Sequence, residues 1–255
     1  MSRRRWEGRA SRLQSSVPPG HYEQDPATHY GDYVLDASWQ YILHGFATER
    51  LDFIISCLGP EEIQRSSFAD IGDSDGTFLR ALGKDGTSIN FSDAVLGNIR
   101  NLKTLKGSLP NINLPDGSFD YVLLFETLEH LPDPVAGLRE VERLARRAAF
   151  VSIPHVKETR FKPYANNPNV PPGESHVFEF CPRDFGTLLS YTRFRVMCAR
   201  RVKVFAAPRS PSEILYWCFA RAVEEANVCC GAFKAFDVYY LQKQPAAPEN
   251  PQDRS

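Results

Sequence analysis

A short loop of acidic residues and glycines is the sharpest chemical feature of the sequence. It reads Phe-Ala-Asp-Ile-Gly-Asp-Ser-Asp-Gly-Thr-Phe over residues 68–78, so Asp70 precedes Gly72, Ser74 and Gly76. We expect a buried strand to end at Asp70 and a helix to begin after the loop. Glycine lets a backbone approach a ligand closely, and N–H groups at a helix N-terminus favour a negative group. Because Asp70 can pair with an ammonium group, the loop predicts a ligand with neighbouring amine and carboxylate groups. The alternative is a tight turn without a ligand.

A further acidic residue, Asp93, follows the next predicted strand about twenty residues after Gly72. An acidic side chain at that place accepts hydrogen bonds from ribose hydroxyls, which indicates a nucleotide-like ligand. An acidic residue at this position also binds the ribose of NAD, so the pattern fits either ligand. Two details disfavour a dinucleotide: Ser74 stands where the second glycine is expected, and Asp70 would repel a pyrophosphate.

Carboxylates and imidazoles are also candidates for catalysis. Glu126, Glu129 and His130 fall within one predicted helical turn. Oxygen ligands suit magnesium, and an added histidine suits zinc or manganese. The alternative, which we favour, is that Glu129 and His130 cap and position the segment, so we expect no metal. His130 and His155 are our candidate general bases, since an unperturbed imidazole titrates near neutrality. We interpret His176 as a loop histidine.

Apolar runs alternate with helical patterns along most of the chain. Such alternation predicts a parallel sheet with helices on both faces and a ligand at the carboxyl ends of the strands. The predicted strands cover 67–71, 87–91, 104–109, 121–125, 148–153, 195–205 and 236–242. The predicted helices begin at 78 and cover 94–102, 134–146, 182–191 and 211–226.

The regions around this alternating pattern have other compositions. Apolar residues at helical spacing over 33–58 predict one or two helices ending at Gly59-Pro60. Residues 155–176 are rich in proline and asparagine and too long for a plain connection, so we expect a lid. In that insert, Arg160 and Lys162 are candidates for contacting an anionic acceptor. The expected division is a basic irregular arm over 1–31, N-terminal helices over 32–65, one domain over 66–243 and a disordered tail over 244–255.

Composition excludes several classes of protein. The 255 residues are 42% hydrophobic, and 30 basic residues balance 31 acidic ones to a net charge of −1, which disfavours nucleic-acid binding. Six cysteines without a Cys-x-x-Cys pair predict neither a disulfide scaffold nor a zinc site of that spacing. We see no secretory signal and no run of eighteen apolar residues, so we expect a cytoplasmic protein without a membrane span.

Two segments resemble a known family. Residues 68–78 and 107–134, the latter reading GSLPNINLPDGSFDYVLLFETLEHLPDP, look like class I S-adenosylmethionine-dependent methyltransferases. The similarity is greatest to the small-molecule branch that includes the ubiquinone-pathway enzymes. The later segment SHVFEFCPRDFGTLLSY is similar to the His-x-x-x-Phe-(Ser/Cys)-Pro segment that follows the fifth strand in that family. This resemblance, over roughly residues 66–205, implies an α/β, Rossmann-like, doubly wound sheet of seven strands with an N-terminal helical extension over the cofactor edge. The last two strands should include the only antiparallel one.

The resemblance also implies the cofactor, S-adenosyl-L-methionine, and its binding residues. Asp70, Gly72, Ser74 and Gly76 would hold the methionine moiety, Asp93 the ribose and Ser108 the adenine, while Phe125 would lie near the sulfonium. The family usually has glycine at the position of Ser74 and aspartate at that of Ser108.

The implied function is methyl transfer to an oxygen, nitrogen or carbon nucleophile of a small molecule. Three alternatives stay open at this point. One is a catalytically inactive methyltransferase-like domain that binds a partner. The second is a metal-assisted RNA 2′-O-methyltransferase, and the third is an NAD-dependent oxidoreductase.

Overall fold

The structure is a computed structural model that describes residues 37–84, 86–161, 176–204 and 234–245. Several predictions lie outside these described residues: the basic arm, the helix over 211–226, most of the lid and most of the C-terminal tail.

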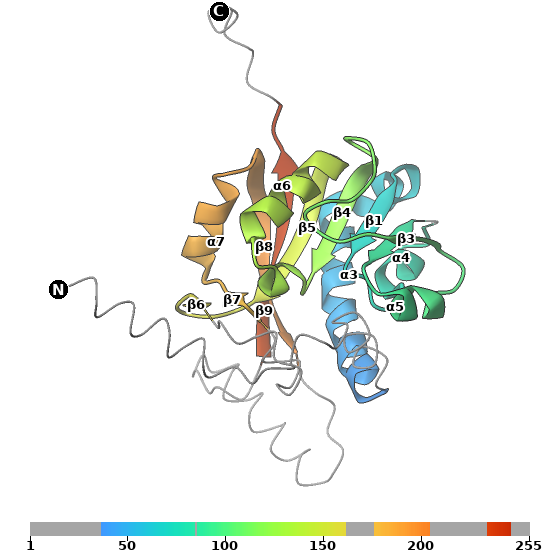
Figure 1. The fold of residues 1–255 in the computed structure, drawn as a ribbon, viewed down its shortest axis with the longest axis horizontal. Coiled ribbons are helices and arrows are strands. Elements are labelled where there is room, and N and C mark those ends of the chain that lie inside the picture. Colours follow the sequence, from blue (N-terminus) through green and yellow to red (C-terminus); the bar gives the residue numbers. More distant parts are fainter. Residues whose placement is uncertain (1–36, 85, 162–175, 205–233, 246–255) are drawn as a thin grey trace, which may run out of the picture.

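The described elements alternate as the sequence pattern predicts (Figure 1). In chain order they are α3 (Ala37–Arg65), β1 (Phe68–Ile71), α4 (Thr77–Ala81), β2 (Thr87–Asn90), α5 (Asp93–Asn98), β3 (Lys103–Lys106), β4 (Phe119–Phe125), the short 3₁₀ helix η1 (Leu128–His130), α6 (Pro134–Leu144), β5 (Ala145–Pro154), β6 (Arg160–Phe161), β7 (Phe178–Glu179), α7 (Pro182–Leu189), β8 (Phe194–Val204) and β9 (Lys234–Lys243).

Seven strands form one sheet in the order β3-β2-β1-β4-β5-β9-β8. Strand β9 is antiparallel to both of its neighbours, β5 and β8, and the other adjacent pairs are parallel. The predicted fold, a doubly wound α/β sheet of seven strands whose last two include the only antiparallel one, is therefore confirmed. Since β1, β2, β4 and β5 all run the same way, their carboxyl ends meet at one edge, which is the lower edge in Figure 1.

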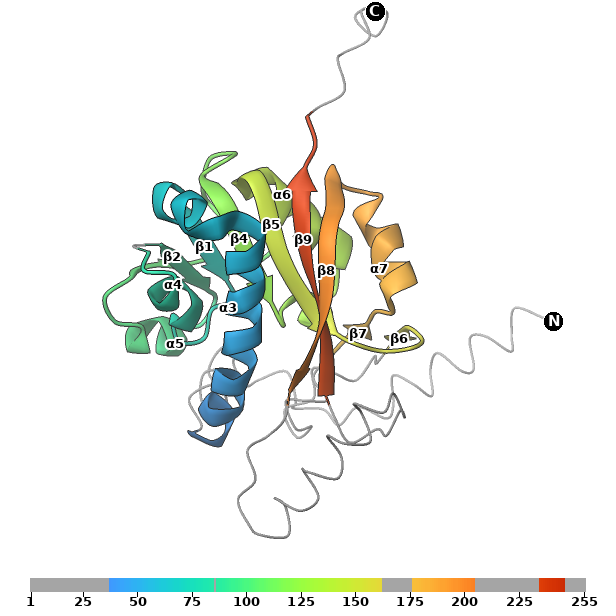
Figure 2. The same ribbon diagram turned by 180° about the vertical axis from the view of Figure 1, so that it is seen from behind.

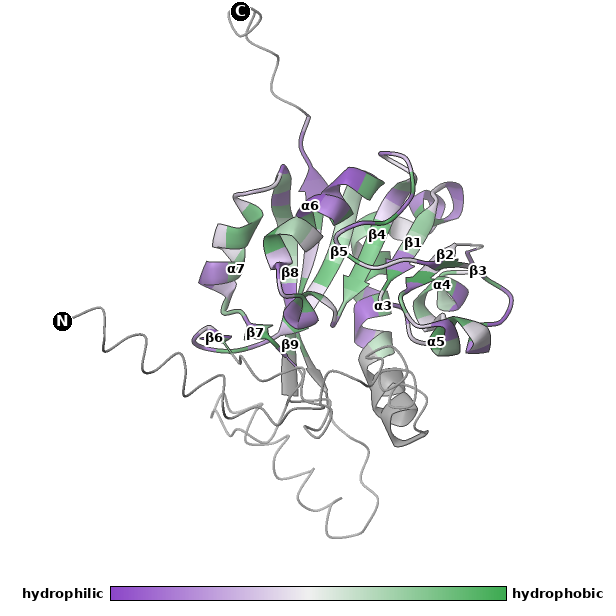
Figure 3. Ribbon diagram, in the orientation of Figure 1, coloured by the Kyte–Doolittle hydropathy of each residue, from purple (hydrophilic) through white to green (hydrophobic). Residues whose placement is uncertain are grey.

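The sheet is covered on both faces by helices. Helices α6 and α7 lie on one face in Figure 1, and α3 and α4 lie on the opposite face, seen in Figure 2. Strands β4 and β5 lie between these layers, which explains why their sequences are almost continuously apolar (Figure 3). Each face has its own apolar core, one around Leu138 and Val141 of α6 and the other around Phe53 and Ile54 of α3.

Two local features differ from the sequence prediction. The first helical segment of α3 ends at Gly59, as predicted, because the φ of 74° there is not helical, but a second helical segment that was not predicted follows directly to Arg65. Proline suits the first turn of a helix, so Pro60 starts this second segment. The insert also contains β6, which pairs antiparallel with β7, just beyond the insert, as a small second sheet.

Helix α3 runs across its face of the sheet, and its N-terminal part extends past the carboxyl edge (Figure 2). Arg50 thereby reaches Glu126, which follows β4, and its guanidinium lies over the rings of Phe125 and Phe236. The N-terminal helix thus packs over the predicted cofactor edge. Among the described helices, none is sufficiently long and apolar to cross a membrane.

Candidate active site

The loop after β1 is held together by its own carboxylates. Oδ1 of Asp73 accepts hydrogen bonds from the backbone N–H groups of Asp75 (3.0 Å) and Gly76 (2.7 Å). Asp75 in turn accepts from the N–H of Thr77 at 2.8 Å. These are the N–H groups that the sequence assigned to a ligand carboxylate. In the structure they are already used within the loop, so that part of the interpretation needs correction.

The glycines of this loop are required by packing as well as by backbone conformation. Gly72 has φ 84°, and a Cβ there would lie 2.1 Å from Oγ1 of Thr127. Gly76 has φ 76°, and a Cβ there would lie 2.5 Å from Leu102. Both positions therefore need glycine in the protein alone, whereas the sequence analysis attributed them to the approach of a ligand. Ser74 is half-buried in the middle of the same loop.

Asp70 lies at the carboxyl end of β1, as predicted, and its side chain is buried. Its Oδ2 atom has no hydrogen-bond partner among the described residues. Burial, reinforced by the nearby charges of Asp73 and Asp75, raises the pKa of this carboxyl well above its usual value, and Arg50 opposes that shift. A buried acceptor without a partner is costly unless a ligand donates to it. Asp70 is therefore well placed to receive a donor at this edge.

The end of β2 differs from the expected arrangement. Asp93 is the first residue of α5, its side chain is 74% exposed, and its carboxylate pairs with Nζ of Lys106 at 2.5 Å. The last residue of β2 is instead Asn90, which is buried and donates through Nδ2 to the backbone oxygen of Asp73 at 2.8 Å. Ser108, beyond the end of β3, is exposed. Within the part of the chain that the structure describes, the side chain of Asp93 contacts Lys106 and that of Ser108 contacts the backbone of Leu109, and neither contacts Asp70.

The end of β4 carries a partly buried ion pair. Phe125 is buried and packs edge to face on Phe78, with ring centroids 4.6 Å apart. Glu126 follows with φ 49°, and its Oε1 accepts from Arg50 at 2.8 Å and from Oγ of Ser152 at 2.7 Å. Burial raises the pKa of Glu126, and the positive charge of Arg50 opposes that change. The turn at Glu126 directs its carboxylate toward Arg50, so the predicted single helical turn of Glu126, Glu129 and His130 is not formed.

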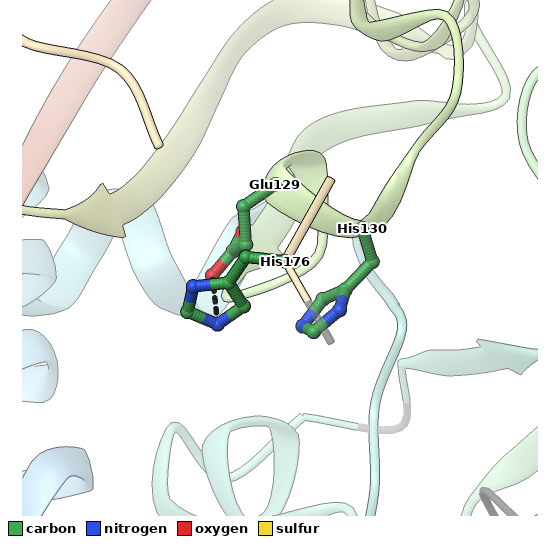
Figure 4. Close-up of side chains that lie close together, drawn as sticks. All are labelled: Glu129, His130 and His176. Carbon is green, nitrogen blue, oxygen red and sulfur yellow. Dashed lines mark ion pairs between the residues drawn. The ribbon is translucent and has the colours of Figure 1, made fainter. Parts of the chain in front are cut away.

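Glu129 and His130 lie on η1, and His176 lies next to them. Oε1 of Glu129 is 3.9 Å from Nε2 of His176, and the rings of His130 and His176 are 4.9 Å apart in a T-shaped arrangement (Figure 4). His176 also contacts Glu179 on β7, with Nδ1 and Oε1 3.1 Å apart. The interpretation of His176 as a plain loop histidine is therefore wrong, because its ring meets two carboxylates. The backbone N–H of Val177 donates to the backbone oxygen of Glu129 at 2.8 Å and holds this segment against η1.

His155 forms a second histidine–carboxylate pair at the same edge. It follows β5, and its Nδ1 lies 2.7 Å from Oδ2 of Asp237 on β9. The other oxygen of Asp237 accepts from Nε of Arg201 on β8 at 3.0 Å. Three adjacent strands thus fix the orientation of one imidazole, and the side chain of His155 remains 20% exposed.

Arg50 and Asp237 were not predicted as site residues, although the pattern around each of them contains a signal. Arg50 lies on the same helical stripe as the buried Ala47 and Ile54, where an apolar residue is expected. Asp237 interrupts an apolar strand between Phe236 and Val238. A charged residue inside an apolar pattern is a signal of a buried partner.

Comparisons with known proteins match part of the sequence to a family and the fold to solved structures. Residues 69–153 match the family described as "Methyltransferase domain". No curated protein sequence matches the chain. Among solved structures, the chain is similar to a methyltransferase of Thermotoga maritima described as a possible histamine N-methyltransferase, with 17% identity, a TM-score of 0.56, and coverage of 85% of this chain and 99% of that one. It is also similar to magnesium protoporphyrin IX methyltransferase from Synechocystis, solved with bound S-adenosylmethionine, with 12% identity, a TM-score of 0.53, and coverage of 88% and 99%.

Residues 69–153 therefore form a methyltransferase domain, within the fold that the chain shares with solved S-adenosylmethionine-dependent methyltransferases. The predictions of an enzyme and of S-adenosylmethionine as its methyl donor are confirmed at the level of that domain.

Proposed function

We propose that the protein transfers the methyl group of S-adenosylmethionine to a small-molecule acceptor at the carboxyl edge of the sheet. The observation that carries the cofactor site is Asp70, a buried carboxylate at the end of β1 whose Oδ2 has no partner among the described residues. An ammonium or hydroxyl group of the cofactor supplies the missing donor. Phe125 is the last residue of the adjacent strand β4, which supports its predicted place next to the sulfonium.

The predicted roles of the other cofactor residues belong to this proposal. The loop of Gly72, Ser74 and Gly76 holds the methionine moiety by its shape. Asp93 binds the ribose only if its side chain leaves Lys106, and Ser108 binds the adenine from the end of β3. The relationship to the ubiquinone-pathway branch is part of the same proposal.

His155 is the proposed general base. Asp237 holds the proton on Nδ1, which leaves Nε2 as the acceptor for a proton of the attacking group. Methyl transfer is an in-line displacement, so the protein needs chiefly to align the nucleophile and, where required, remove its proton. His130 is the other candidate base, and it lies beside Glu129 and His176.

The alternatives make distinct demands on the chain. An RNA methyltransferase needs a broad basic surface, and the net charge of −1 disfavours it. An inactive, partner-binding domain has no need to keep an unpartnered buried carboxylate at the strand edge.

Calorimetry with S-adenosylhomocysteine tests the cofactor site. We expect micromolar binding, weakened roughly 10- to 100-fold in Asp70→Asn through loss of a charged hydrogen bond. The exposed Asp52→Asn is the matched control and retains full affinity. No binding by the wild type, or binding of NAD instead, contradicts the proposal.

Incubation with methyl-labelled S-adenosylmethionine and separated metabolite and RNA pools tests the acceptor. Label should enter the metabolite pool, and His155→Asn should reduce transfer by about 10²-fold or more without changing S-adenosylhomocysteine affinity. Label in the RNA pool alone favours the second alternative.

A further inference from the structure

Two cysteines that are far apart in the sequence lie in direct contact on the sheet face that α3 covers. Sγ of Cys57, on α3, is 3.1 Å from Sγ of Cys198, on β8, although 141 residues separate them along the chain. Both cysteines are free thiols. Helix α3 contacts β8 on the face of the sheet that is seen in Figure 2. The pair of thiols belongs to this contact between helix and strand.

An irregularity in β8 places Cys198 on this face. Val196 of β8 pairs with Leu241 of β9, and two residues later Cys198 pairs with Tyr240, so the register shifts by one residue between them. A regular register would place Cys198 opposite Tyr239, which belongs to the apolar core on the other face of the sheet. Tyr240 packs against the core beneath α3. The β-bulge therefore turns the thiol of Cys198 toward α3.

Neighbouring side chains hold the same two elements together. Arg200, two residues after Cys198, places its guanidinium 5.3 Å from the ring centroid of Phe53 on α3. Its Nη2 atom lies 3.5 Å from Oγ of Ser56, the residue before Cys57. Cys57 itself packs against the apolar core beneath the helix. The two thiols are therefore held next to each other from both the helix and the strand.

The surroundings of the two thiols differ. Cys198 is exposed, whereas Cys57 is partly buried. Burial first, and then the hydrogen bond to Cys198, raise the pKa of Cys57 to about 12, and the charge of Arg200 opposes this shift. Cys57 therefore keeps its proton and donates its S–H to the sulfur of Cys198, which is accessible from solution. An exposed cysteine next to a second, resolving cysteine is typical of redox-sensitive sites.

We propose that Cys57 and Cys198 form a reversible disulfide between α3 and β8, with a low-molecular-weight disulfide such as oxidised glutathione as the oxidant. The Cys198 thiolate attacks one sulfur of oxidised glutathione, so a mixed disulfide forms and one glutathione thiolate leaves. Cys57 then loses its proton, and its thiolate attacks Sγ of Cys198 and displaces the second glutathione thiolate. The two protons lost by the cysteines end on the two glutathione thiolates. The protein loses two electrons, and oxidised glutathione gains them as it becomes two thiols.

The bond would fix α3 more firmly to the sheet. Its formation requires the two sulfurs to approach by about 1 Å, since a disulfide bond is about 2.05 Å long. Cys57 lies about two helical turns after Arg50, which holds α3 over the carboxyl edge. A cross-link between residues so far apart also restricts the unfolded chain, which raises stability. Because exposed disulfides are readily reduced, the surrounding redox conditions would set how firmly α3 is held.

Peptide mapping of the full chain tests the bond without reference to methyl transfer. The protein is incubated in glutathione buffers in which either the oxidised or the reduced form predominates, its free thiols are alkylated, and it is digested without reductant. We expect a linked pair of peptides carrying Cys57 and Cys198 in the oxidising buffer, and its loss on return to the reducing buffer.

Four results of this mapping would contradict the proposal. Two free thiols in both buffers, or glutathione attached to Cys198 without the linked pair, overturns it. A bond from either residue to another cysteine of the chain overturns it as well. A linked pair that persists in the reducing buffer overturns its reversibility.

Thermal unfolding tests the effect on the helix. We expect the Tm of the oxidised wild type to exceed that of the reduced protein by roughly 5–15 °C. Cys57→Ser and Cys198→Ser should each abolish both the linked pair and this difference. Cys181→Ser, at a cysteine outside the pair, is the matched control and should keep the difference. Equal Tm values for the oxidised and reduced wild type would overturn the proposed effect on α3.

Discussion

Gly72 illustrates how one residue can combine conformation with packing at this site. Its φ of 84° is unfavourable for other residues, and Thr127 occupies the space where a side chain would begin. Thr127 is itself positioned by a hydrogen bond of 3.0 Å to the backbone oxygen of Phe125. The loop after β1 is therefore locked to the end of β4.

Gly72→Ala should consequently lower the free energy of unfolding by about 2–4 kcal/mol, from backbone strain and overpacking together. Gly97→Ala is the matched control, since α5 is exposed there and no atom lies within 4 Å of the added Cβ. That substitution should leave the free energy of unfolding unchanged or raise it by up to about 1 kcal/mol. Urea unfolding of the two variants gives the comparison, and equal effects would contradict this account of Gly72.

At the scale of elements, the C-terminal segment of α3 is anchored to β4 and β5 through one carboxylate. Glu62 accepts hydrogen bonds from Oγ of Ser66 at 2.8 Å and from Oη of Tyr121 at 3.0 Å, and it pairs with Arg65 and Arg147. These hydrogen bonds, that of Ser66 first, lower the pKa of Glu62 to about 2.

A lowered pKa makes the stabilisation by Glu62 depend on pH. The contribution is complete above the unfolded-state pKa of about 4.3 and is lost as the pH falls toward about 2. Glu62→Gln should therefore lower the urea midpoint at pH 7, and the difference from the wild type should narrow progressively below about pH 4.5. Glu61→Gln, at an exposed neighbouring position, should show no such difference. A difference that stays constant from pH 7 to pH 3 would exclude this linkage.

At the scale of the whole molecule, Arg50 connects the N-terminal helix to the strands that form the site. Its side chain is 2% exposed and its partner Glu126 is 24% exposed. Burial lowers the pKa of Arg50, while the charge of Glu126 opposes that change. The guanidinium also lies 5.2–5.5 Å from two ring centroids, so both charge and packing hold α3 over the edge.

Arg50→Met should lower the free energy of unfolding by roughly 2–4 kcal/mol, because it leaves the partly buried Glu126 without its cation. The partial exposure of Glu126 makes this loss smaller than that from breaking a fully buried ion pair. The double variant Arg50→Met/Glu126→Gln should recover at least about 1 kcal/mol relative to additivity. Equilibrium urea unfolding of the four proteins measures this coupling. Strictly additive effects would show that the ion pair does not link helix and sheet.

The sequence by itself determined the fold and placed Asp70 at the sheet edge where we propose the active site. Burial imposes a local periodicity on apolar strands such as Tyr121–Phe125 and on amphipathic helices such as Pro134–Leu144. Strands that alternate with helices leave few possible topologies, and these have parallel strands. The element bounds mostly agreed within two or three residues. Asp70 was placed correctly at the end of β1 because a strand terminus is a local property.

Only the tertiary structure decided which side chains meet at that edge. Glu126 turns toward Arg50 of a distant helix, which separates it from Glu129 in spite of their spacing. His176 lies next to Glu129 because the residues before β7 pack against η1, and His155 finds Asp237 because β9 inserts antiparallel beside β5. Contacts between segments far apart in the sequence depend on how the chain packs, and a local pattern carries no information about the partner that burial will supply.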